Sequence, residues 1–252
     1  MRLWGINPVA ERLRTDPRSV RKVYLHRQRS ASEVFHLCRE TGIELELLSD
    51  EQFRRLASGL HAQGVVADVE GFAYVNYETL IDSAVPKPTL VFLDGVTDPQ
   101  NFGSMLRTLA CLGGFAVVLP KHESVDVTDA VLRVASGGEN YVPVAKVTNL
   151  ANAIRAAKEQ KYWIVAAVAE GGEALSQREL PSPLGVVLGA EGRGVRPGLL
   201  KQADLRVMVP MSGAALSLNV SVACALVCYE VVRQRSTPLK RESPQKREKE
   251  SC

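Results

Sequence analysis

The segment from Leu90 to Arg107, LVFLDGVTDPQNFGSMLR, joins an apolar run, a polar turn and the start of a helix. The run Leu90–Leu93 contains no charged residue, and we interpret it as a strand that is buried on both faces. The pattern up to Leu112 predicts a helix directly after the turn. A buried strand followed by a helix is the repeating unit of α/β proteins, so this segment indicates an α/β fold with a parallel sheet.

The turn between the expected strand and helix carries three residues that can serve a ligand. Asn101 can cap a helix that starts near Phe102, and Gly103 allows a close approach to the backbone. Arg107 lies about one turn inside that helix, and its long side chain can lean back toward the amino end. Open α/β sheets bind ligands at the carboxyl ends of their strands, where this turn lies. Taken alone, the pattern fits a capping Asn and a surface Arg equally well.

The same alternation of strands and helices continues to about residue 235. Strands are expected at Leu90–Leu93, Ala116–Leu119, Tyr141–Val144, Trp163–Ala167, Gly185–Leu188 and Arg206–Val209, with helices between them. Several of these strands are continuous apolar runs, which is typical of a parallel sheet covered on both faces. We therefore expect one α/β domain over residues 89–235.

The amino-terminal part predicts a smaller α/β unit over residues 1–73. Helices are expected at Pro8–Leu13, with Asn7 as cap, at Ser32–Glu40, and at Glu51–Ala57, with Asp50 as cap; strands are expected at Lys22–Leu25, Glu44–Leu48 and Gly64–Val69. Residues 74–88 are less periodic and contain two prolines, which indicates a linker. Residues 236–252 are charged and almost free of apolar side chains, so we expect a disordered tail.

Charge is unevenly distributed along the 252 residues, whose net charge is only +3. The first 30 residues hold eight basic and two acidic side chains, a net charge of +6. The basic residues are Arg2, Arg12, Arg14, Arg18, Arg21, Lys22, Arg27 and Arg29, and the acidic ones are Glu11 and Asp16. A basic end on a nearly neutral protein favours a polyanionic partner, although a solvated face would have the same composition.

The five cysteines indicate a reducing, cytoplasmic environment, because their number is odd and their spacing is not that of a disulfide framework. Cys224 and Cys228 lie four residues apart on an expected apolar helix. Since no second pair of ligands exists, we expect them to be buried structural residues and expect no metal. No signal peptide is evident after Met1. The longest apolar run, Leu216–Val232, contains serine, asparagine and glutamate, so no membrane span is expected.

A second turn, Val187–Val195 (VLGAEGRGV), follows another apolar strand. Its glycines let the backbone approach a ligand, but their order is G-x-x-G-x-G and not the dinucleotide-binding order G-x-G-x-x-G. Glu191 would also repel a pyrophosphate. These two points disfavour the alternative of a nicotinamide-dependent oxidoreductase.

A third turn lies within Val207–Ala223 (VMVPMSGAALSLNVSVA). A strand ends at Pro210, and either Ser217 or Asn219 caps a helix that is apolar nearly all round. Such a helix must be buried, in the core or against a second subunit.

Together, the three turns resemble the SpoU/TrmH class of SPOUT RNA 2′-O-ribose methyltransferases. The resemblance rests on N-x-G-x-x-x-R at Asn101–Arg107, on G-A-E-G-x-G at Gly189–Gly194, and on P-M-x-G-x-x-x-S-L-N-V-S-V-A at Pro210–Ala223. It covers essentially all of residues 89–235. Residues 1–73 look like the small L30e-like RNA-binding domain of members that methylate ribosomal RNA. The runs LDGVTDPQNFG and VPVAKVTNLA resemble most the subgroup that methylates a guanosine ribose of 23S rRNA.

The resemblance implies an α/β carboxyl-terminal domain with a deep trefoil knot, and a homodimer whose active site uses both subunits. It also implies that S-adenosylmethionine binds in the knot loops and that RNA is the substrate. The implied catalytic residues are Arg107, Asn101, Glu191, Asn219 and Ser217, and the implied cofactor contacts are Gly189, Val209, Leu218, Leu188, Gly192, Pro210 and Met211.

The resemblance also implies roles for these residues in activating a ribose hydroxyl. Because a guanidinium stays protonated, we expect Arg107 to stabilise the developing alkoxide by hydrogen bonding rather than to act as a base. Asn101 would orient Arg107 or the ribose. Glu191 would hold Asn101 or Arg107 in place, and Ser217 and Asn219 would complete the pocket.

Two further alternatives stay open at this point. Residues 89–235 also resemble relatives that methylate tRNA and lack the small domain, so tRNA is an alternative substrate. A noncatalytic RNA-binding protein could keep the small domain and lose activity, but the intact Arg107, Glu191 and Asn219 argue against it. The expected function is therefore S-adenosylmethionine-dependent 2′-O-methylation of RNA, with 23S rRNA as the substrate.

Overall fold

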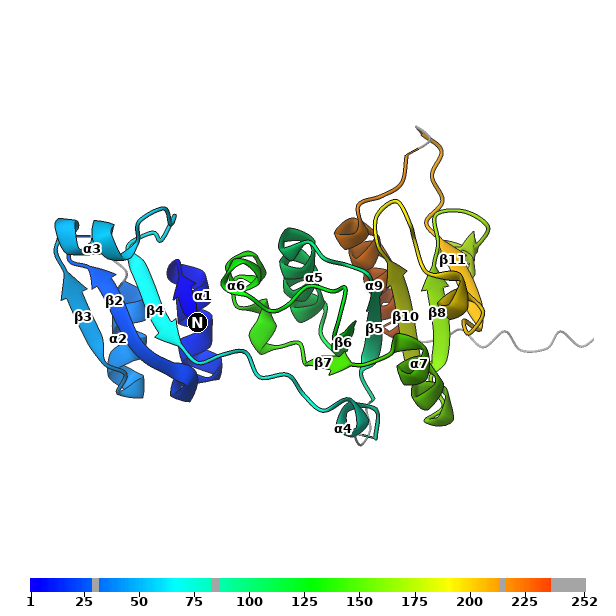
Figure 1. Cartoon of the computed structure of the whole chain (residues 1–252), viewed down its shortest axis with the longest axis horizontal. Helices are drawn as coiled ribbons and strands as arrows, with labels where there is room; N and C mark the ends of the chain where they lie inside the picture. Colours follow the sequence, from blue (N-terminus) through cyan, green and yellow to red (C-terminus); the bar gives the residue numbers. More distant parts are fainter. Residues whose placement is uncertain (29–31, 83–86, 214–215, 237–252) are drawn as a thin grey trace, which may run out of the picture.

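The computed structural model describes residues 1–28, 32–82, 87–213 and 216–236, which form two α/β domains (Figure 1). The domain on the left of Figure 1 contains a four-stranded sheet, and the domain on the right contains a seven-stranded sheet. The α/β class expected for both parts is confirmed. The charged tail expected over 236–252 lies outside the described residues, except for Ser236 at the end of the last helix.

The small domain is built on the strands β1 (Arg2–Trp4), β4 (Val65–Val69), β2 (Val20–His26) and β3 (Leu45–Leu48), in that order across the sheet. β1 and β2 run antiparallel to β4, and β3 runs parallel to β2. The helices α1 (Ile6–Thr15), α2 (Ser32–Thr41) and α3 (Asp50–Leu56) and the turn η1 (Pro17–Ser19) complete it. The edge strand β1 is absent from the expected strands, because three residues are too few to show an alternating pattern.

The starts of two helices differ from the expectation. α1 begins at Ile6, so Asn7 lies inside the helix and does not cap it. Ser49, not Asp50, caps α3: its hydroxyl accepts the Gln52 N–H at 3.4 Å, and Gln52 Oε1 accepts the Ser49 N–H at 3.0 Å. This reciprocal pair satisfies two amide groups at once, which favours Ser49 over Asp50 as the cap.

The larger domain holds a sheet in the order β7-β6-β5-β10-β8-β11-β9, with every described pair parallel. Its strands are β5 (Thr89–Asp94), β6 (Phe115–Pro120), β7 (Val144–Val147), β8 (Trp163–Ala167), β9 (Glu173–Ala174), β10 (Leu184–Gly189) and β11 (Leu205–Met208), and its short turns are η2 (Gly138–Asn140) and η3 (Leu175–Gln177). The strand expected at Tyr141–Val144 is wrong except for its last residue. Tyr141 closes η2, and Pro143 has no N–H to donate to a ladder.

Helices cover both faces of this sheet. Along β5, Val91 and Leu93 belong to the core on the side of α5 (Pro99–Leu112), α6 (Asp129–Ala135) and α9 (Val220–Ser236). Leu90 and Phe92 belong to the core on the side of α4 (Tyr77–Asp82), α7 (Leu150–Glu159) and α8 (Pro197–Leu200). All four side chains are fully buried. The continuous apolar runs in the sequence follow from this double coverage.

Of the segment expected as a linker, residues 74–82 contain α4 and lie against the larger domain, and residues 83–86 lie outside the described residues. The Val75 N–H donates to the Val144 carbonyl at 2.9 Å beside β7. The Tyr77 hydroxyl donates to the Ala153 carbonyl at 2.6 Å on α7. The first part of the connection is therefore held by the larger domain.

Among the described helices, none combines the length and the apolar character that a membrane crossing requires. The trefoil knot stays a prediction, because the order of the strands alone does not define the path of the connections between them.

Candidate functional site

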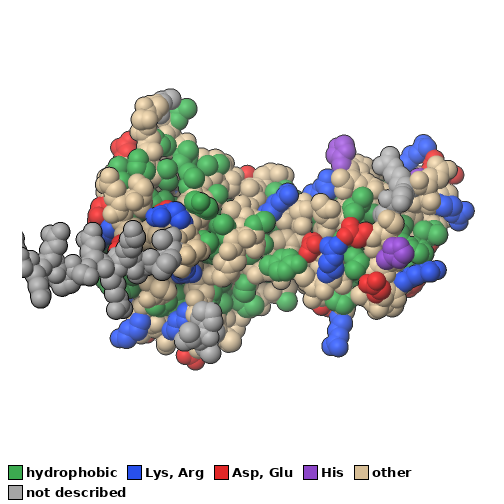
Figure 2. All heavy atoms as spheres, turned by 180° about the vertical axis from the view of Figure 1, so that it is seen from behind, with side chains coloured by type: hydrophobic (Ala, Val, Ile, Leu, Met, Phe, Trp, Pro, Cys, Tyr) green, Lys and Arg blue, Asp and Glu red, His purple; other side chains and the backbone are tan. Residues whose placement is uncertain are grey.

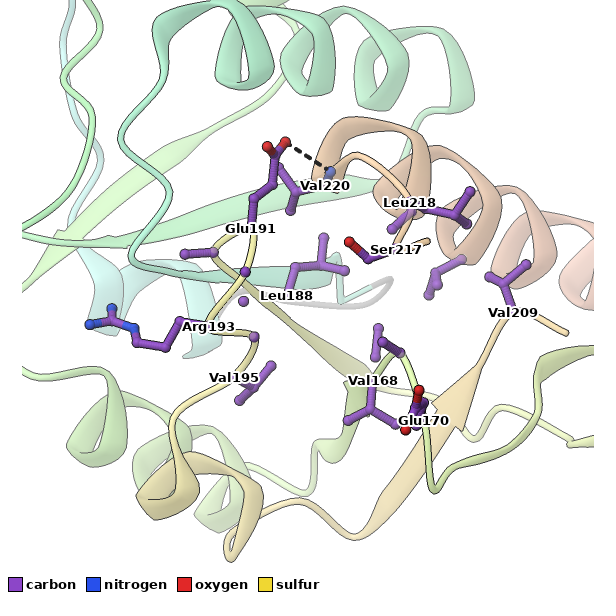
Figure 3. A pocket seen from close by; sticks show the side chains of 18 of the residues that line it. Val168, Glu170, Leu188, Glu191, Arg193, Val195, Val209, Ser217, Leu218 and Val220 are labelled. Atoms are coloured by element: carbon purple, nitrogen blue, oxygen red, sulfur yellow. Dashed lines mark hydrogen bonds between the residues drawn. The ribbon is translucent and has the colours of Figure 1, made fainter. Parts of the chain in front are cut away.

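A cavity of about 390 Å³ opens at the carboxyl ends of β8, β10 and β11, the edge at which open α/β sheets bind ligands (Figure 3). The turn after β10 forms one wall, and the segment from β11 to the start of α9 forms another. Eight of the expected site residues line it: Leu188, Gly189, Glu191, Gly192, Val209, Met211, Ser217 and Leu218. The second and third sequence motifs therefore face one another across a single cavity.

The turn after β10 brings two parts of the backbone into contact. A Cβ atom on Gly189 would lie 2.0 Å from the carbonyl carbon of Gly194 and 2.2 Å from the nitrogen of Val195, so no larger residue fits there. Gly192 and Gly194 have φ angles of 76° and 67°, which glycine adopts without strain. The Gly194 N–H donates to the Ala190 carbonyl at 2.8 Å and closes the turn. A tight turn whose backbone lines the cavity thus requires these glycines.

Glu191 lies where the three sequence motifs meet. Its Oε1 accepts hydrogen bonds from Asn101 Nδ2 at 3.1 Å and from Asn219 Nδ2 at 2.7 Å. It also accepts the Val220 N–H at 3.4 Å, the contact drawn as a dashed line in Figure 3. Asn219 Nδ2 reaches Asn101 Oδ1 as well, at 2.9 Å. Three side chains from distant parts of the sequence therefore form one polar cluster, here called the Asn101–Glu191–Asn219 cluster.

The first turn of α5 explains why the Asn101 side chain is free to reach Glu191. α5 begins at Pro99, and Asp98 caps it by accepting the N–H groups of Gln100 at 3.1 Å and of Asn101 at 3.3 Å. The expectation that Asn101 caps this helix is wrong, because an Asp followed by a Pro starts the helix three residues earlier. The amide of Asn101 is therefore left for the cluster.

Asn219, and not Ser217, caps α9. Its Oδ1 accepts the N–H and the hydroxyl of Ser221 at 2.8 and 2.6 Å, and the helix begins one residue after it. Asn219 thus caps the helix with its oxygen and reaches Glu191 with its nitrogen. The side chain of Ser217 points into the cavity (Figure 3).

Arg107 lies outside this cluster within one chain. It follows Asn101 by six residues, which places the two side chains about 120° apart around the axis of α5. Arg107 is exposed and does not line the cavity, and its side chain makes no hydrogen bond or ion pair with any residue that the structure describes. Glu191 was expected to hold either Asn101 or Arg107, and within one chain it bonds Asn101. Pro210, expected as a cofactor contact, also lies outside the lining.

The sequence analysis did not predict one wall of the cavity. Residues 167–170, at the end of β8 and just after it, line the cavity, and Glu170 places an exposed carboxylate there (Figure 3). These residues directly follow an expected strand. The rule that ligands bind at the carboxyl ends of parallel strands is the signal that could have identified them.

Asp94, at the end of β5, anchors both ends of the turn after β10. Its side chain is fully buried, with Oδ1 2.6 Å from Arg196 Nε, and its Oδ2 accepts the Arg196 N–H at 2.8 Å. The Asp94 carbonyl accepts the Ala190 N–H at 2.9 Å. A buried carboxylate is tolerated because it is paired in this way, and the pairing fixes the turn against β5.

Cys224 and Cys228 are both buried in α9, with their sulfur atoms 4.0 Å apart. The neighbouring Cys224 thiol and burial raise the pKa of Cys228 well above its ordinary value, so this thiol stays protonated and unreactive. Over the described part of the chain, no three His, Cys, Asp or Glu side chains are grouped so as to hold a metal ion.

Residues 88–229 match the family described as SpoU rRNA Methylase family, and residues 2–75 match the one described as RNA 2′-O ribose methyltransferase substrate binding. The chain is 37% identical over 238 residues to the 23S rRNA (guanosine-2′-O-)-methyltransferase RlmB of Ralstonia nicotianae, covering 93% of this chain and 96% of that protein. It is 35% identical over 245 residues to the protein of the same name from Pseudomonas syringae, covering 95% and 98%.

A solved structure shares the fold of both domains. The SpoU methyltransferase AviRb from Streptomyces viridochromogenes, in complex with the cofactor AdoMet, matches with a TM-score of 0.77 at 24% identity. The match covers 93% of this chain and 90% of that chain.

Proposed function

Because the chain belongs to the SpoU rRNA methylase family, we propose that it transfers a methyl group from S-adenosylmethionine to a ribose 2′-hydroxyl of a guanosine in 23S rRNA. The Asn101–Glu191–Asn219 cluster beside the cavity carries this proposal, because it joins all three motifs in one site. The two relatives named for guanosine methylation of 23S rRNA cover 93% and 95% of the chain, so their likeness includes the small domain.

The cavity fits S-adenosylmethionine in size and in chemical character. Its volume of about 390 Å³ lies within the range of about 300–1,000 Å³ that is usual for small-molecule sites. Val209, Leu218 and Val227 offer an apolar wall for an adenine ring, and the glycine turn exposes main-chain groups. The carboxylate of Glu170, which has no partner among the described residues, can accept hydrogen bonds from hydroxyl or ammonium groups. When bound, S-adenosylmethionine supplies an electrophilic methyl group on a positively charged sulfur.

The cluster leaves one donor for the ribose. Asn101 gives one of its two amide hydrogens to Glu191, and its oxygen accepts from Asn219. The second hydrogen of Asn101 is free to donate to a ribose oxygen. Since a ribose hydroxyl is a weak nucleophile, aligning it and stabilising its developing negative charge are the main catalytic tasks. Glu191 contributes by fixing the side-chain amides of Asn101 and Asn219 in one orientation.

Arg107 reaches this site from a second subunit in the proposed homodimer. Its position on α5 turns it away from the Asn101 side of the helix. On α9, Val222, Leu226 and Tyr229 are 46%, 39% and 59% exposed, and their spacing places them on one face. Figure 2 shows hydrophobic side chains on the surface of the larger domain, to the left in that view. A dimer that covers the apolar face of α9 would also allow Arg107 of the partner subunit to approach the cluster.

Mixed dimers test this shared site. Arg107→Ala and Glu191→Gln are each expected to be nearly inactive alone, because each removes one half of every site. A mixed dimer of the two variants would contain one site with both wild-type residues, so random mixing would restore about a quarter of the wild-type activity. Absence of any restored activity after confirmed subunit exchange would refute the shared site.

The small domain is the proposed RNA-binding part, but its basic residues are not a free patch. Figure 2 shows Lys, Arg and His side chains spread over this domain, to the right in that view. Five of the eight basic residues near the amino end pair within the chain: Arg2 with Asp68, Arg12 with Glu139, Arg14 with Glu11 and Glu33, Arg21 with Glu70, and Lys22 with Glu44 and Glu46. Arg18 and Arg27 are exposed and have no such partner among the described residues. The net charge of this segment therefore overstates its attraction for RNA.

Transfer of labelled methyl groups tests the proposed activity. Unmodified 23S rRNA and unmodified tRNA are incubated in parallel with the protein and labelled S-adenosylmethionine, and the label is mapped by its resistance to alkaline cleavage. Label at an alkali-resistant guanosine of 23S rRNA is expected, and ribosomal RNA as substrate would place the enzyme in the cytoplasm. Label on tRNA alone would replace the substrate, whereas cofactor binding without transfer would favour a noncatalytic RNA-binding protein.

A further inference from the structure

A second cavity, of about 610 Å³, lies at the carboxyl ends of β5, β6, β7 and β10, and the function proposed above gives it no role. Arg193, in the turn after β10, belongs to the lining of both cavities. The second cavity is also lined by Arg196, His122 and Glu123. This ionic lining differs from the apolar wall of the cofactor cavity and indicates a charged ligand.

The Arg193 guanidinium has no ion-pair partner in the part of the chain that the structure describes. Its side chain leaves the turn on the side away from Ser217 and Leu218 (Figure 3). It lies over Gly95, where an added Cβ would be 2.6 Å from Arg193 Nη2, so the guanidinium uses space that any larger residue would fill. Within the described ranges, this guanidinium donates no hydrogen bond to the protein. All of its donors are therefore available to a ligand.

Arg196 is held in a fixed position in the same cavity. Its Nε lies 2.6 Å from Oδ1 of the fully buried Asp94, while 43% of the Arg196 side chain is exposed. Nε and Oδ1 form a close ion pair without hydrogen-bond geometry, and the two Nη groups make no hydrogen bond with a described residue, so they are left for a ligand. Glu123 is the acidic residue of the lining and Asp94 offsets the charge of Arg196, so the convergent donors, and not an excess of positive charge, favour an anion. The arrangement favours an anion that accepts several hydrogen bonds.

The amino end of α7 adds main-chain donors. This helix has ten residues, and Asn149, Leu150 and Ala151 line the cavity. Asn149 Oδ1 accepts the Asn152 N–H at 3.1 Å, so the N–H groups of Leu150 and Ala151 remain without an intrahelical partner. Free amides at the start of a helix favour a negatively charged group, which agrees with the two arginines.

We propose that this cavity binds a phosphate of the substrate RNA strand beside the methylated nucleotide, with Arg193 and Arg196 as donors. The proposal rests on the proposed function, which makes RNA the substrate. Arg193 follows Glu191 by two residues, so their Cα atoms are no more than about 7 Å apart. A strand whose ribose reaches the Asn101–Glu191–Asn219 cluster can therefore place a neighbouring phosphate at the second cavity, and a strand phosphate explains this closeness better than free phosphate does.

The test compares Arg193→Ala with Arg155→Ala. Arg155 is a matched control, because it is an exposed arginine of α7 that lines neither cavity and has no ion-pair partner among the described residues. Affinity for a 23S rRNA fragment is measured by filter binding at several salt concentrations, without turnover. Loss of one single-strand phosphate contact lowers the slope of log affinity against log salt by about 0.7. Arg193→Ala is expected to show this change and to bind roughly tenfold more weakly, whereas Arg155→Ala keeps the wild-type values.

Two outcomes would overturn the proposal. One is an unchanged salt slope and affinity in Arg193→Ala. The other is loss of S-adenosylmethionine binding in the same variant, measured by calorimetry, because it would assign Arg193 to the cofactor turn.

A chemical variant of the RNA separates this proposal from the proposed function. Neutral methylphosphonate linkages on either side of the target nucleotide are expected to remove the difference between wild type and Arg193→Ala. If wild type does not methylate 23S rRNA while Arg193→Ala still lowers the salt slope, the proposed substrate fails and the phosphate site stands. If wild type methylates 23S rRNA and the neutral linkages leave the difference intact, the phosphate site fails and the proposed function stands.

Discussion

Replacing Arg12 with alanine is expected to destabilise the contact between the two domains by about 3 kcal/mol. Arg12 lies on α1 of the small domain, and its Nη2 is 3.2 Å from Oε1 of Glu139, on η2 of the larger domain. The two side chains are 7% and 0% exposed, so water does not screen the ion pair. Arg12 Nη1 also donates to the Ser19 hydroxyl at 3.3 Å.

The magnitude follows from the burial of both charges. An exposed ion pair contributes about 0–1 kcal/mol, whereas removing one partner of a buried pair costs about 3–5 kcal/mol. Arg12 Nε and Glu139 Oε2 have no hydrogen-bond partner among the described residues, so the pair is incompletely satisfied and the lower end applies. Burial raises the pKa of Glu139 even with the guanidinium beside it, so without Arg12 the carboxyl can take up a proton, which also limits the cost.

The two tryptophans allow each domain to be followed separately. Trp4 lies on β1 of the small domain, and Trp163 lies on β8 of the larger domain. Urea unfolding of single-tryptophan variants, Trp4→Phe and Trp163→Phe, reports the transition of one domain at a time. In the wild-type background the two transitions are expected to coincide, and with Arg12→Ala the small domain is expected to unfold first.

A paired substitution decides whether the ion pair is the cause. Arg12→Met with Glu139→Leu removes both charges and keeps apolar volume, and it is expected to recover most of the lost stability. Arg18→Ala is the control, because Arg18 is an exposed arginine of the same domain, and a change within about 0.5 kcal/mol is expected there. A double variant as unstable as Arg12→Ala, or coinciding transitions in Arg12→Ala, would refute the reasoning.

Two further predictions concern the proposed catalytic side chain of Arg107 and a buried thiol. Arg107→Lys is expected to lose most methyl transfer while S-adenosylmethionine binding, measured by calorimetry, is retained, because lysine keeps the charge and lacks the planar set of donors; near-normal turnover would contradict the proposed role. Cys38 is expected to resist alkylation at neutral pH, because burial raises its pKa to about 11 and the thiolate is the reactive form. Its labelling, followed by mass spectrometry of its peptide, is expected to speed up as pH rises toward that pKa, and equal rates in folded and unfolded protein at pH 7 would contradict this.

The central strands could be predicted because the sheet is covered on both faces. β8 coincides with the expected Trp163–Ala167, and β5 and β10 extend the expected strands by one residue at each end. In these strands nearly every residue contributes to one of the two cores, so the apolar run and the strand have the same extent. β1 lacks this signal because it is a three-residue edge strand that is held by pairing with β4.

Helix starts and charge pairs were harder to predict, because they depend on competition between neighbours. Asp98 and Asn101 are both good caps, and the proline after Asp98 decides in favour of the earlier start. On the small domain, Lys22 pairs with Glu44 and Glu46 because β2 and β3 lie side by side. Counting charges along the sequence does not reveal such a pair, which is why the basic amino end looked less compensated than it is.

The sequence could predict that the motifs of the polar cluster lie close together. It could not predict which side chains bond to one another. The strands before the first two motifs, β5 and β10, are neighbours in the sheet, so their following turns meet at one edge. That argument brings Asn101 and Glu191 near one another, and it equally allows Arg107 as the partner of Glu191. The choice depends on the rotation of α5, which the cap at Asp98 sets.

α5 contacts both the Asn101–Glu191–Asn219 cluster and η2, the turn that pairs with the small domain. Its first turn holds Asn101 in the cluster, and farther along the helix the backbone of Arg107 lies so close to η2 that a Cβ on Gly138 would be 2.8 Å from the Arg107 Cα. The next residue of η2, Glu139, makes the buried pair with Arg12 of the small domain. In the proposed function, an RNA bound by the small domain is thus oriented toward Asn101 through α1, η2 and α5, a path of buried contacts. The contact at Arg12 therefore contributes to where the RNA lies relative to the site.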